Sequence, residues 1–376
     1  MDCAVARIAP SAAPQVDFAL VGHPESWSAA AEVFSALRGP EHTPLPDDEI
    51  KDILPWIPPR AVCRVDVKST GHAKASGPYI EAHGLYIDSF ISPDHLDAAF
   101  VQENLTRVRA AAAYAIKAGA RIVSLGGFSS ILLEGKFDQL PPRQRTVFTT
   151  GNTLTVAFIV QGIETMCALQ GRNLRRSTLL VVGATGDVGS GSVRCLAGKV
   201  KRVQLYARNA ERLRRLAAEL DAEGVEVEIR TDLAQFSEEA DLVICAASLP
   251  SSSLLLRNIA PDALVCDAGY PKNLSPDAET SRATIFFGGL GQITGGMTFD
   301  PDLHGILNCH PFPDVAHGCL LEGIALALEG RFEPFSHGRG AITPKLVDEI
   351  ATIASRHGIY LAPFFNGDGP LPLTMK

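Results

Sequence analysis

Reactive side chains are concentrated in the stretch HGILNCHPFPDVAHGCLLEG, residues 304–323. It holds three histidines and two cysteines, residue types that bind metal ions or act as nucleophiles and bases. They form no C-x-x-C pair and no H-E-x-x-H helix, and two of them are adjacent and cannot easily chelate one ion together. The spacing therefore argues against a metal site whose ligands would come from His304, Cys309, His310, His317 and Cys319.

Cys319 has the sequence setting of a nucleophile. The run GCLLEGIALALEGRF predicts a helix that begins near Cys319, and the unpaired amides and dipole of a helix N-terminus stabilise a thiolate. Glu322 is expected over the same first turn, and His317 could pair with the thiol. Cys309 precedes a Pro-Phe-Pro break and has no comparable setting. The alternative, that Cys319 is a small buried core residue, stays open on these residues alone.

A nucleophile of this kind often works with a bound cofactor, and residues 178–198 are a candidate cofactor-binding segment. TLLVVGATGDVGSGSVRCLAG reads as a strand, a glycine-rich turn and a helix, with Gly183, Gly186 and Gly189 spaced G-x-x-G-x-x-G. The first two glycines let the backbone approach a pyrophosphate, and the third lets helix and strand pack closely. A glycine triplet alone is a weak signal. A second strand at 203–209 follows at the right distance and strengthens the prediction of a dinucleotide-binding loop.

The end of that second strand indicates which cofactor is bound. NAD sites usually present Asp or Glu there to the ribose 2′-hydroxyl. This sequence instead has Arg208 and Asn209, with Arg212 one turn into the next helix. A guanidinium group matches a 2′-phosphate in charge and geometry. We therefore expect the cofactor to be NADPH.

Three further strands, at 225–230, 241–250 and 263–274, complete a doubly wound parallel sheet of the Rossmann type over about 176–290. Besides the glycines and the second-strand residues, we expect the cofactor to contact Thr185, Asp187, Val188, Ser248 and Tyr270.

The N-terminal half also alternates strands with helices, which predicts a second α/β layer. We expect strands at 16–22, 61–67, 78–87 and from 120. Helices are expected at 26–37, capped by Ser26, and at 93–120, from Pro93 to about Gly119, with irregular structure at 44–60. Residues 145–171 should form a strand, a turn at 150–152 and a long apolar helix.

The fold class that follows is α/β: an N-terminal α/β domain, a central Rossmann doubly wound parallel sheet and a C-terminal helical segment. The expected division is a loose arm at 1–15, a substrate domain at 16–171, an NADP-binding domain at 172–290 and a mainly helical region carrying the nucleophile at 291–376.

Composition restricts the class of function. The chain has 376 residues, 46% of them hydrophobic, and a formal net charge of −8, which argues against a nucleic-acid binder. Its 8 cysteines are scattered and form no disulfide framework. We find neither a signal peptide nor a continuous apolar run long enough to cross a membrane. We therefore expect a cytoplasmic protein with reduced thiols, and the sequence does not indicate an oligomeric state.

Seven segments together resemble a known family, the long-chain acyl-[acyl-carrier-protein] reductases of cyanobacteria. They are SLGGFSSI (124–131), FTTGNTLTV (148–156), VVGATGDVGS (181–190), ARNAERL (207–213), DAGYPKNL (267–274), CLLEGIALALEG (319–330) and FSHGRGAIT (335–343). The resemblance extends through most of the chain from about residue 120, is weakest over the first 60 residues, and departs in detail at 287–318.

The resemblance implies a specific reaction. Members of this family bind NADPH on the central module, and a cysteine matching Cys319 attacks an acyl-carrier-protein thioester. The acyl-enzyme then accepts hydride and releases an aldehyde. The departure at 287–318 leaves open an acyl group that is shorter, functionalised or carried by CoA. The family's Cys-x-x-Glu spacing is kept as Cys319 and Glu322, whereas His317 is not part of the family motif.

Two other functions stay open. One is a dehydrogenase of the shikimate or glutamyl-tRNA-reductase type, which shares the layout of a catalytic domain followed by a Rossmann domain. A glutamyl-tRNA reductase would carry its cysteine in the N-terminal domain, where this chain has Cys3 and Cys63. The other is a non-catalytic NADP-sensing protein, in which Cys319 would be inert.

Overall fold

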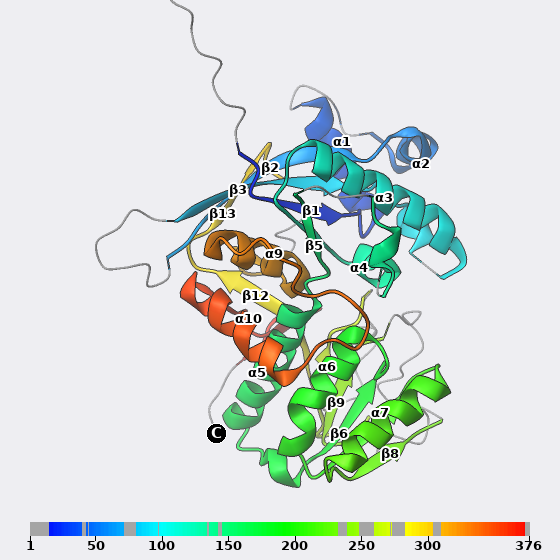
Figure 1. Cartoon of the computed structure of the whole chain (residues 1–376), viewed down its shortest axis with the longest axis vertical. Helices are drawn as coiled ribbons and strands as arrows, with labels where there is room; N and C mark the ends of the chain where they lie inside the picture. Colours follow the sequence, from blue (N-terminus) through cyan, green and yellow to red (C-terminus); the bar gives the residue numbers. More distant parts are fainter. Residues whose placement is uncertain are drawn as a thin grey trace, which may run out of the picture.

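Two six-stranded sheets organise the computed structural model, one in the upper and one in the lower half of Figure 1. The structure describes residues 15–39, 43, 45–70, 80–96, 98–133, 135–141, 145–231, 239–247, 259–270, 272, 283–303 and 310–372. The expected N-terminal arm, His304, Cys309 and Ser248 lie outside these residues.

The upper sheet is mixed, in the order β13-β2-β3-β1-β4-β5. Its central strands β3, β1, β4 and β5 run parallel, while β2 and β13 are antiparallel to their neighbours. The strands are β1 (Phe18–Gly22), β2 (Arg60–Lys68), β3 (Glu81–Asp88), β4 (Ile122–Leu125), β5 (Val147–Thr149) and β13 (Met297–Asp300). The helices of this half are α1 (Trp27–Arg38), α2 (Asp47–Ile53), α3 (Val101–Lys117) and α4 (Phe128–Leu133).

The lower sheet is fully parallel, in the order β11-β10-β9-β6-β7-β8. This is the doubly wound Rossmann arrangement, whose strand order reverses beside its first strand, here β6. Sequence analysis predicted it correctly. The elements are β6 (Thr178–Val182), α6 (Asp187–Leu196), β7 (Arg202–Tyr206), α7 (Ala210–Ala222), β8 (Val227–Ile229), β9 (Leu242–Cys245), β10 (Leu264–Asp267) and β11 (Thr284–Phe287).

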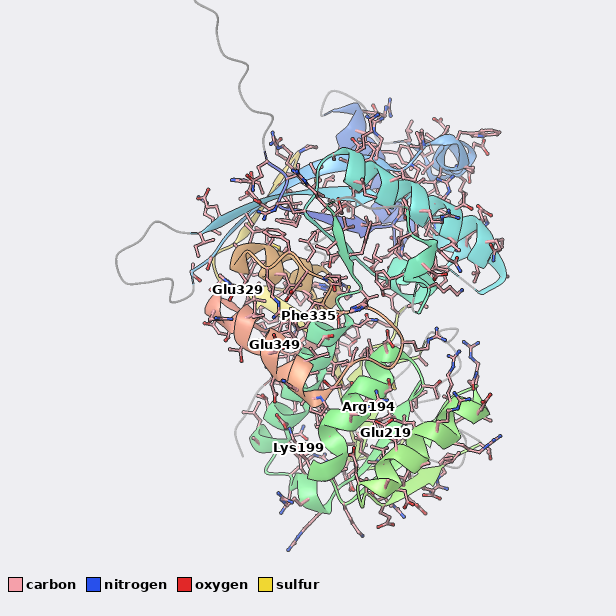
Figure 2. All side chains as sticks on the ribbon, in the orientation of Figure 1. Arg194, Lys199, Glu219, Glu329, Phe335 and Glu349 are labelled. Carbon is pink, nitrogen blue, oxygen red and sulfur yellow. The ribbon has the colours of Figure 1, made fainter. Side chains whose placement is uncertain are left out.

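Helix α5 (Asn152–Leu169) joins the two halves. It packs against α6 of the Rossmann half and also against α9 and α10, and Lys199 Nζ lies 2.7 Å from Glu164 Oε1 on it. Lys199 is labelled in Figure 2, as are Arg194 and Glu219, which join α6 to α7. Helix α5, with 18 residues, is long and apolar enough to cross a membrane, which we did not expect from the sequence. However, 67% of these residues are buried within the protein. That burial is what the core helix of a folded domain shows.

The region after residue 290 contributes to both halves. It carries the expected helices, α9 (Gly318–Glu329) and α10 (Pro344–Arg356), and also strands that we did not predict. Strand β13 completes the upper sheet by pairing with β2. The remaining strands are β12 (Leu290–Ile293), β14 (Val315–His317) and β15 (Ile359–Leu361), which form a small sheet, and the hairpin of β16 (Phe365–Asn366) with β17 (Gly369–Pro370).

Two N-terminal expectations were wrong in detail. The stretch 44–60 is not irregular: Asp47, Asp48 and Glu49 form the first turn of α2, where negative charge favours a helix N-terminus. The helix expected from Pro93 begins later, at Val101. Pro93–His95 form a separate 3₁₀ turn, whose last carbonyl accepts a hydrogen bond from Asn104 Nδ2 at 2.7 Å.

Candidate active site

The phosphate loop between β6 and α6 has the backbone geometry of a nucleotide cradle. Gly183 has a φ of +87°, and a Cβ there would lie 2.6 Å from the Ala246 carbonyl oxygen. A Cβ on Gly189 would lie 2.2 Å from the Gly183 carbonyl oxygen, so the third glycine lets α6 approach β6. A Cβ on Gly186 would meet the Gly183 carbonyl oxygen at 3.5 Å, an ordinary contact distance, so the backbone itself does not require glycine there. The bare backbone at Gly186 and the amides at the start of α6 suit a pyrophosphate.

This loop borders a cavity of about 380 Å³ at the carboxyl ends of the Rossmann strands. Its opposite side is built from the upper half, by the start of α4, the start of α5 and the start of α9. The expected residues that line it are Gly183, Thr185, Gly186, Asp187, Val188, Arg208, Asn209, Arg212, Tyr270, His317 and Cys319. The structure thus brings the phosphate loop and the proposed nucleophile, 130 residues apart, to one cavity.

The residues after β7 divide into two kinds. Arg208 and Arg212 are exposed and line the cavity. Asn209 is the N-cap of α7, and its Oδ1 accepts a hydrogen bond from Arg212 N at 3.0 Å. Its side chain therefore holds the helix in place, and the two arginines are the groups that can meet a 2′-phosphate. Arg339 lines the same cavity and was not expected there.

Asp187 fixes the phosphate loop to a distant segment. Its side chain is 4% exposed, and its Oδ1 accepts a hydrogen bond from Gly340 N at 2.8 Å. The carboxylate that the sequence placed next to the cofactor is thus engaged with the loop after α9. The backbone amide at this first position of α6 is what the cradle offers to a phosphate.

Cys319 is the second residue of α9, which begins at Gly318 after the N-cap residue His317. The thiol-bearing residue is 8% exposed. Gly151, with a φ of +67°, lets α5 approach it, because a Cβ there would lie 2.3 Å from Cys319 Cα. Ser124 Oγ donates to the Cys319 carbonyl from the end of β4. These contacts fix the start of α9 between β4 and α5.

The thiol itself is less acidic than its helix position predicts. Burial raises the pKa of Cys319 to about 11, and hydrogen bonds from the backbone of Gly127 and Leu320 oppose this rise without cancelling it. Loss of hydration outweighs the dipole and the amide donors.

His317 stands beside the thiol as a neutral ring. Burial, helped by the charges of Lys272 and His23, lowers the pKa of His317 to about 3. His310, whose ring centroid lies 5.5 Å from that of His317, is likewise held neutral, with its pKa lowered to about 3 mainly by burial. A ring with so low a pKa is a weak base, which argues against His317 as the group that removes the thiol proton.

His23, at the end of β1, is a site residue that sequence analysis missed. Its Nε2 lies 3.0 Å from the donor Phe128 N and 3.3 Å from Tyr270 Oη. Its Nδ1 lies 3.0 Å from the Pro24 carbonyl oxygen. Because Phe128 N must donate, Nε2 accepts, so the proton of the neutral ring is on Nδ1. A histidine after a buried strand gave no signal of this role in the sequence.

Glu322 does not face the cavity. It is 0% exposed, and its carboxylate accepts hydrogen bonds from Thr149 Oγ1, from Leu154 N at 3.0 Å and from Ser336 Oγ at 2.9 Å. Leu154 belongs to the first turn of α5, so Glu322 caps that helix from α9. This arrangement favours a positioning role for Glu322.

Within the described parts of the chain, no group of three or more His, Cys, Asp or Glu residues could hold a metal ion. His304 and Cys309, two of the candidate ligands, lie outside them.

Comparison with known proteins separates the cofactor-binding half from the whole chain. A family model described as shikimate/quinate 5-dehydrogenase matches residues 166–287, which is essentially the Rossmann half. The aminotransferase PigE of a Serratia species is 24% identical over 265 residues, covering 66% of this chain and 29% of that protein. Both matches are partial.

Solved structures give weaker similarity. Ligand-free 5-ketofructose reductase of a Gluconobacter strain covers 90% of this chain and 100% of its own, at a TM-score of 0.39 and 11% identity. Glutamyl-tRNA reductase from Methanopyrus kandleri covers 49% of this chain and 46% of its own, at a TM-score of 0.28 and 19% identity. At these scores nothing about activity follows.

One relative covers nearly the full length. The long-chain acyl-[acyl-carrier-protein] reductase of Synechococcus elongatus is 32% identical over 354 residues, which are 91% of this chain and 97% of that protein. The chain therefore belongs to the family of long-chain acyl-[acyl-carrier-protein] reductases.

Proposed function

We propose that the protein reduces an acyl thioester to an aldehyde with NADPH, through an acyl group bound covalently to Cys319. The observation that carries this proposal is that Cys319 and the phosphate loop line one cavity. A thioester carbonyl is electrophilic and has a competent leaving group, and a cysteine nucleophile keeps the acyl group activated after the carrier departs. Acyl-carrier protein or CoA is the proposed carrier of the acyl group, and membership of the family supports this choice.

The residues present fit NADPH. Gly186 leaves room for a pyrophosphate against bare backbone, and the amides at the start of α6 supply donors. Arg208 and Arg212 offer guanidinium groups for the 2′-phosphate. Bound there, NADPH supplies the hydride that brings the acyl carbonyl to the oxidation level of an aldehyde.

In the first step the Cys319 sulfur bonds to the thioester carbonyl carbon, and the bond from that carbon to the carrier sulfur breaks. The proton lost by Cys319 balances the proton gained by the departing carrier thiol, so the exchange is neutral overall. Hydrogen bonds from the backbone of Gly127 and Leu320 support the sulfur as it becomes negative.

In the second step the acyl carbonyl gains a hydride and the bond to Cys319 sulfur breaks. The aldehyde leaves, and the sulfur regains a proton. The net change is one thioester, one hydride and one proton giving one aldehyde and one thiol. A thiol used in this way has to stay reduced, and the 6 cysteines of the described residues are all free, which supports the cytoplasm as the place of action.

Replacing Cys319→Ser tests the proposal. A serine keeps the shape, but its hydroxyl is far less acidic and a much weaker nucleophile than a thiol. The mass of an acyl-enzyme, seen with wild type after incubation with thioesters without NADPH, should therefore be absent. NADPH binding, followed by fluorescence, should be unchanged. Cys167→Ser, a buried thiol remote from the cavity lining, is the matched control and should still be acylated. An acylated Cys319→Ser protein would exclude this function.

A further inference from the structure

Tyr270 lies where two cavities meet. A second cavity, of about 150 Å³, adjoins the cofactor cavity, and the walls of both include Gly127, Tyr270, His317 and Cys319. Tyr270 follows the end of β10, so its side chain comes to this place from the carboxyl edge of the Rossmann sheet. A side chain in this position borders both the space next to the thiol and the space for the cofactor.

Contacts with one glycine bring the Tyr270 hydroxyl close to the thiol. A Cβ on Gly127 would lie 3.1 Å from Tyr270 Oη. The backbone of the same glycine donates a hydrogen bond to the Cys319 sulfur, and charge on Cys319 is one of the influences on the pKa of Tyr270. The hydroxyl and the sulfur therefore approach the same residue, and an acyl group on the sulfur would begin beside the hydroxyl.

The proposed reaction creates negative charge on the acyl oxygen twice. Attack by sulfur on the thioester and addition of hydride to the acyl-enzyme each convert the carbonyl into a tetrahedral centre with a negative oxygen. The backbone donors of Gly127 and Leu320 are directed at the sulfur, so the oxygen needs a donor of its own. A single donor to such an oxygen is worth about 10²–10³ in rate.

Tyr270 can be this donor because its hydroxyl keeps its proton. Burial, helped by the charge of Glu25, raises the pKa of Tyr270 well above its ordinary value. His23 Nε2 lies 3.3 Å from Tyr270 Oη, but its lone pair accepts from Phe128 N at the shorter distance of 3.0 Å. Glu25 is exposed, so water can replace its contact with the phenol. The hydroxyl can therefore turn toward an acyl oxygen.

Other polar groups in the wall of the cofactor cavity are engaged elsewhere. The hydroxyls of Ser130 and Thr155 donate to backbone carbonyl oxygens at 2.9 Å and 3.1 Å. Lys272 donates to the Asp267 carbonyl oxygen at 3.2 Å and does not line the second cavity. Of these donors, Tyr270 alone borders both cavities.

His317 is a competing candidate for the same role. Its ring lies edge-on to that of Tyr270, with centroids 6.2 Å apart, and burial lowers the pKa of His317 to about 3. A neutral imidazole has one N–H group, which is less acidic than a phenol and so forms a weaker hydrogen bond to a negative oxygen. This difference favours Tyr270.

We propose that Tyr270 is a catalytic residue whose hydroxyl donates a hydrogen bond to the acyl oxygen in both tetrahedral states. The phenol keeps its proton throughout. The electron pair on oxygen re-forms the carbonyl as the carrier sulfur departs in the first step and the Cys319 sulfur in the second. His23, whose ring lies edge-on to that of Tyr270 at 5.5 Å, is the positioning residue. The inference rests on the proposed function and adds this donor to it.

Tyr270→Phe removes only the hydroxyl. With palmitoyl-CoA and no NADPH, intact mass should show Cys319 acylated roughly 100-fold more slowly than in wild type. When acylated protein is then mixed with NADPH, the fall in nicotinamide absorbance during one turnover should be slowed by a similar factor. NADPH affinity, followed by fluorescence, should stay within ~2-fold of wild type. Tyr360→Phe, on β15 and outside both cavities, is the control and should leave both rates unchanged.

His23→Ala and His23→Gln test the positioning role. Alanine leaves the tyrosine without its neighbour and should slow both steps roughly 10-fold. Glutamine offers a carbonyl oxygen to Phe128 N and should restore most of the rate. In a Tyr270→Phe background His23→Ala should cause little further loss, because the group that it positions is already gone. The two single His23 variants also test the inference should Tyr270→Phe fail to fold.

The possible outcomes are distinct. Wild-type rates in Tyr270→Phe would overturn the inference and leave Cys319 as the nucleophile. A folded Tyr270→Phe protein with an equal loss of NADPH affinity would also overturn it, because the tyrosine would then serve the cofactor. A larger loss of rate in His317→Ala than in Tyr270→Phe would assign the role to the histidine. Failure of wild type to become acylated at Cys319 would overturn the proposed function and this inference together.

Discussion

At Cys319 two physical effects act on one sulfur in opposite directions. Its place at the start of α9 brings amide donors and the positive end of the helix dipole, and its 8% exposure removes the water that would solvate a thiolate. Burial has the larger effect and raises the pKa of the thiol to about 11.

The first residue-scale prediction concerns the pH dependence of this thiol. Since its pKa is about 11, the thiolate fraction should rise about tenfold per pH unit from pH 7 to 9, and alkylation by iodoacetamide should follow it without a plateau. The measurement is peptide mass spectrometry of the Cys319 peptide. A plateau near pH 7 would mean that the helix terminus dominates after all.

Arg208 allows a second prediction at this scale. Losing a charged contact to the 2′-phosphate costs about 1.5–3 kcal/mol, so Arg208→Ala should weaken NADPH binding roughly 10- to 100-fold, with NADH affinity almost unchanged. Titration of both cofactors by fluorescence measures this. Arg214→Ala, on the following helix α7 but outside the cavity lining, is the control. An equal loss for both cofactors would indicate a structural role for Arg208.

Site residues were predictable where the chemistry is local in sequence. The glycine spacing of the phosphate loop and the helix-start setting of Cys319 are contained within short segments, and the structure brings both to one cavity. His23 and Arg339 come to the site from opposite ends of the chain. They belong to no short motif whose spacing would predict their place in the site. Asn209 and Glu322 were expected at the site from their residue types, and the structure shows that each also accepts a hydrogen bond from the first turn of a helix.

At the scale of elements, the start of α5 depends on a group from another helix. Its N-cap residue Gly151 has no side chain to satisfy the first-turn amides. Glu322 of α9 supplies the acceptor for Leu154 N, and Ser336 Oγ lies 3.1 Å from Thr153 N. One buried carboxylate therefore ties α5, α9 and β5 together, which fixes the geometry around Cys319.

Glu322→Gln tests this tie. The amide nitrogen cannot accept, so a donor among Thr149, Leu154 and Ser336 loses its partner, and unfolding free energy should fall by about 1–3 kcal/mol. Urea denaturation measures the change. Glu164→Gln removes a surface ion pair with Lys199 and should cost less than about 1 kcal/mol. Equal effects for the two variants would contradict the capping role.

The boundaries of helices and strands were predicted correctly where the hydrophobic periodicity and the turn or capping residues indicate the same boundary. Ser26 caps α1 as expected, and Gly119, with a φ of +82°, follows the end of α3. The start of α3 was missed because Pro93 is as well suited to a 3₁₀ turn as to a helix. The strands after residue 290 are two to four residues long, and pairing with distant partners rather than their own pattern makes them strands.

For the molecule as a whole, burial of Asp88 links folding to pH. Desolvation raises the pKa of Asp88 from its ordinary 3.8 to about 7, so between these values the folded protein holds a proton that the unfolded chain releases. Raising pH through this window therefore removes stability, by up to about 1.4 kcal/mol per pH unit from this group.

Urea denaturation at pH 4.5, 5.5 and 6.5 checks this sign. The decline in unfolding free energy with rising pH should be shallower in Asp88→Asn than in wild type, because asparagine does not titrate. Glu81→Gln, on the exposed end of β3, should keep the wild-type slope. Parallel slopes for wild type and Asp88→Asn would show that the buried carboxyl is already ionised in the folded protein.

The segment that follows α9 has a consequence for recombining this protein with its relatives. Ser336 Oγ donates a hydrogen bond to Glu322 of α9, and four residues later Gly340 N donates one to Asp187 at the phosphate loop. If residues 166–287 were exchanged as one block, the phosphate loop of the relative would have to bind the segment 335–343 of the original chain. Chimeras that replace residues 335–343 together with this block should retain both hydrogen bonds. The part of the chain to be exchanged therefore consists of two segments that are separate in the sequence.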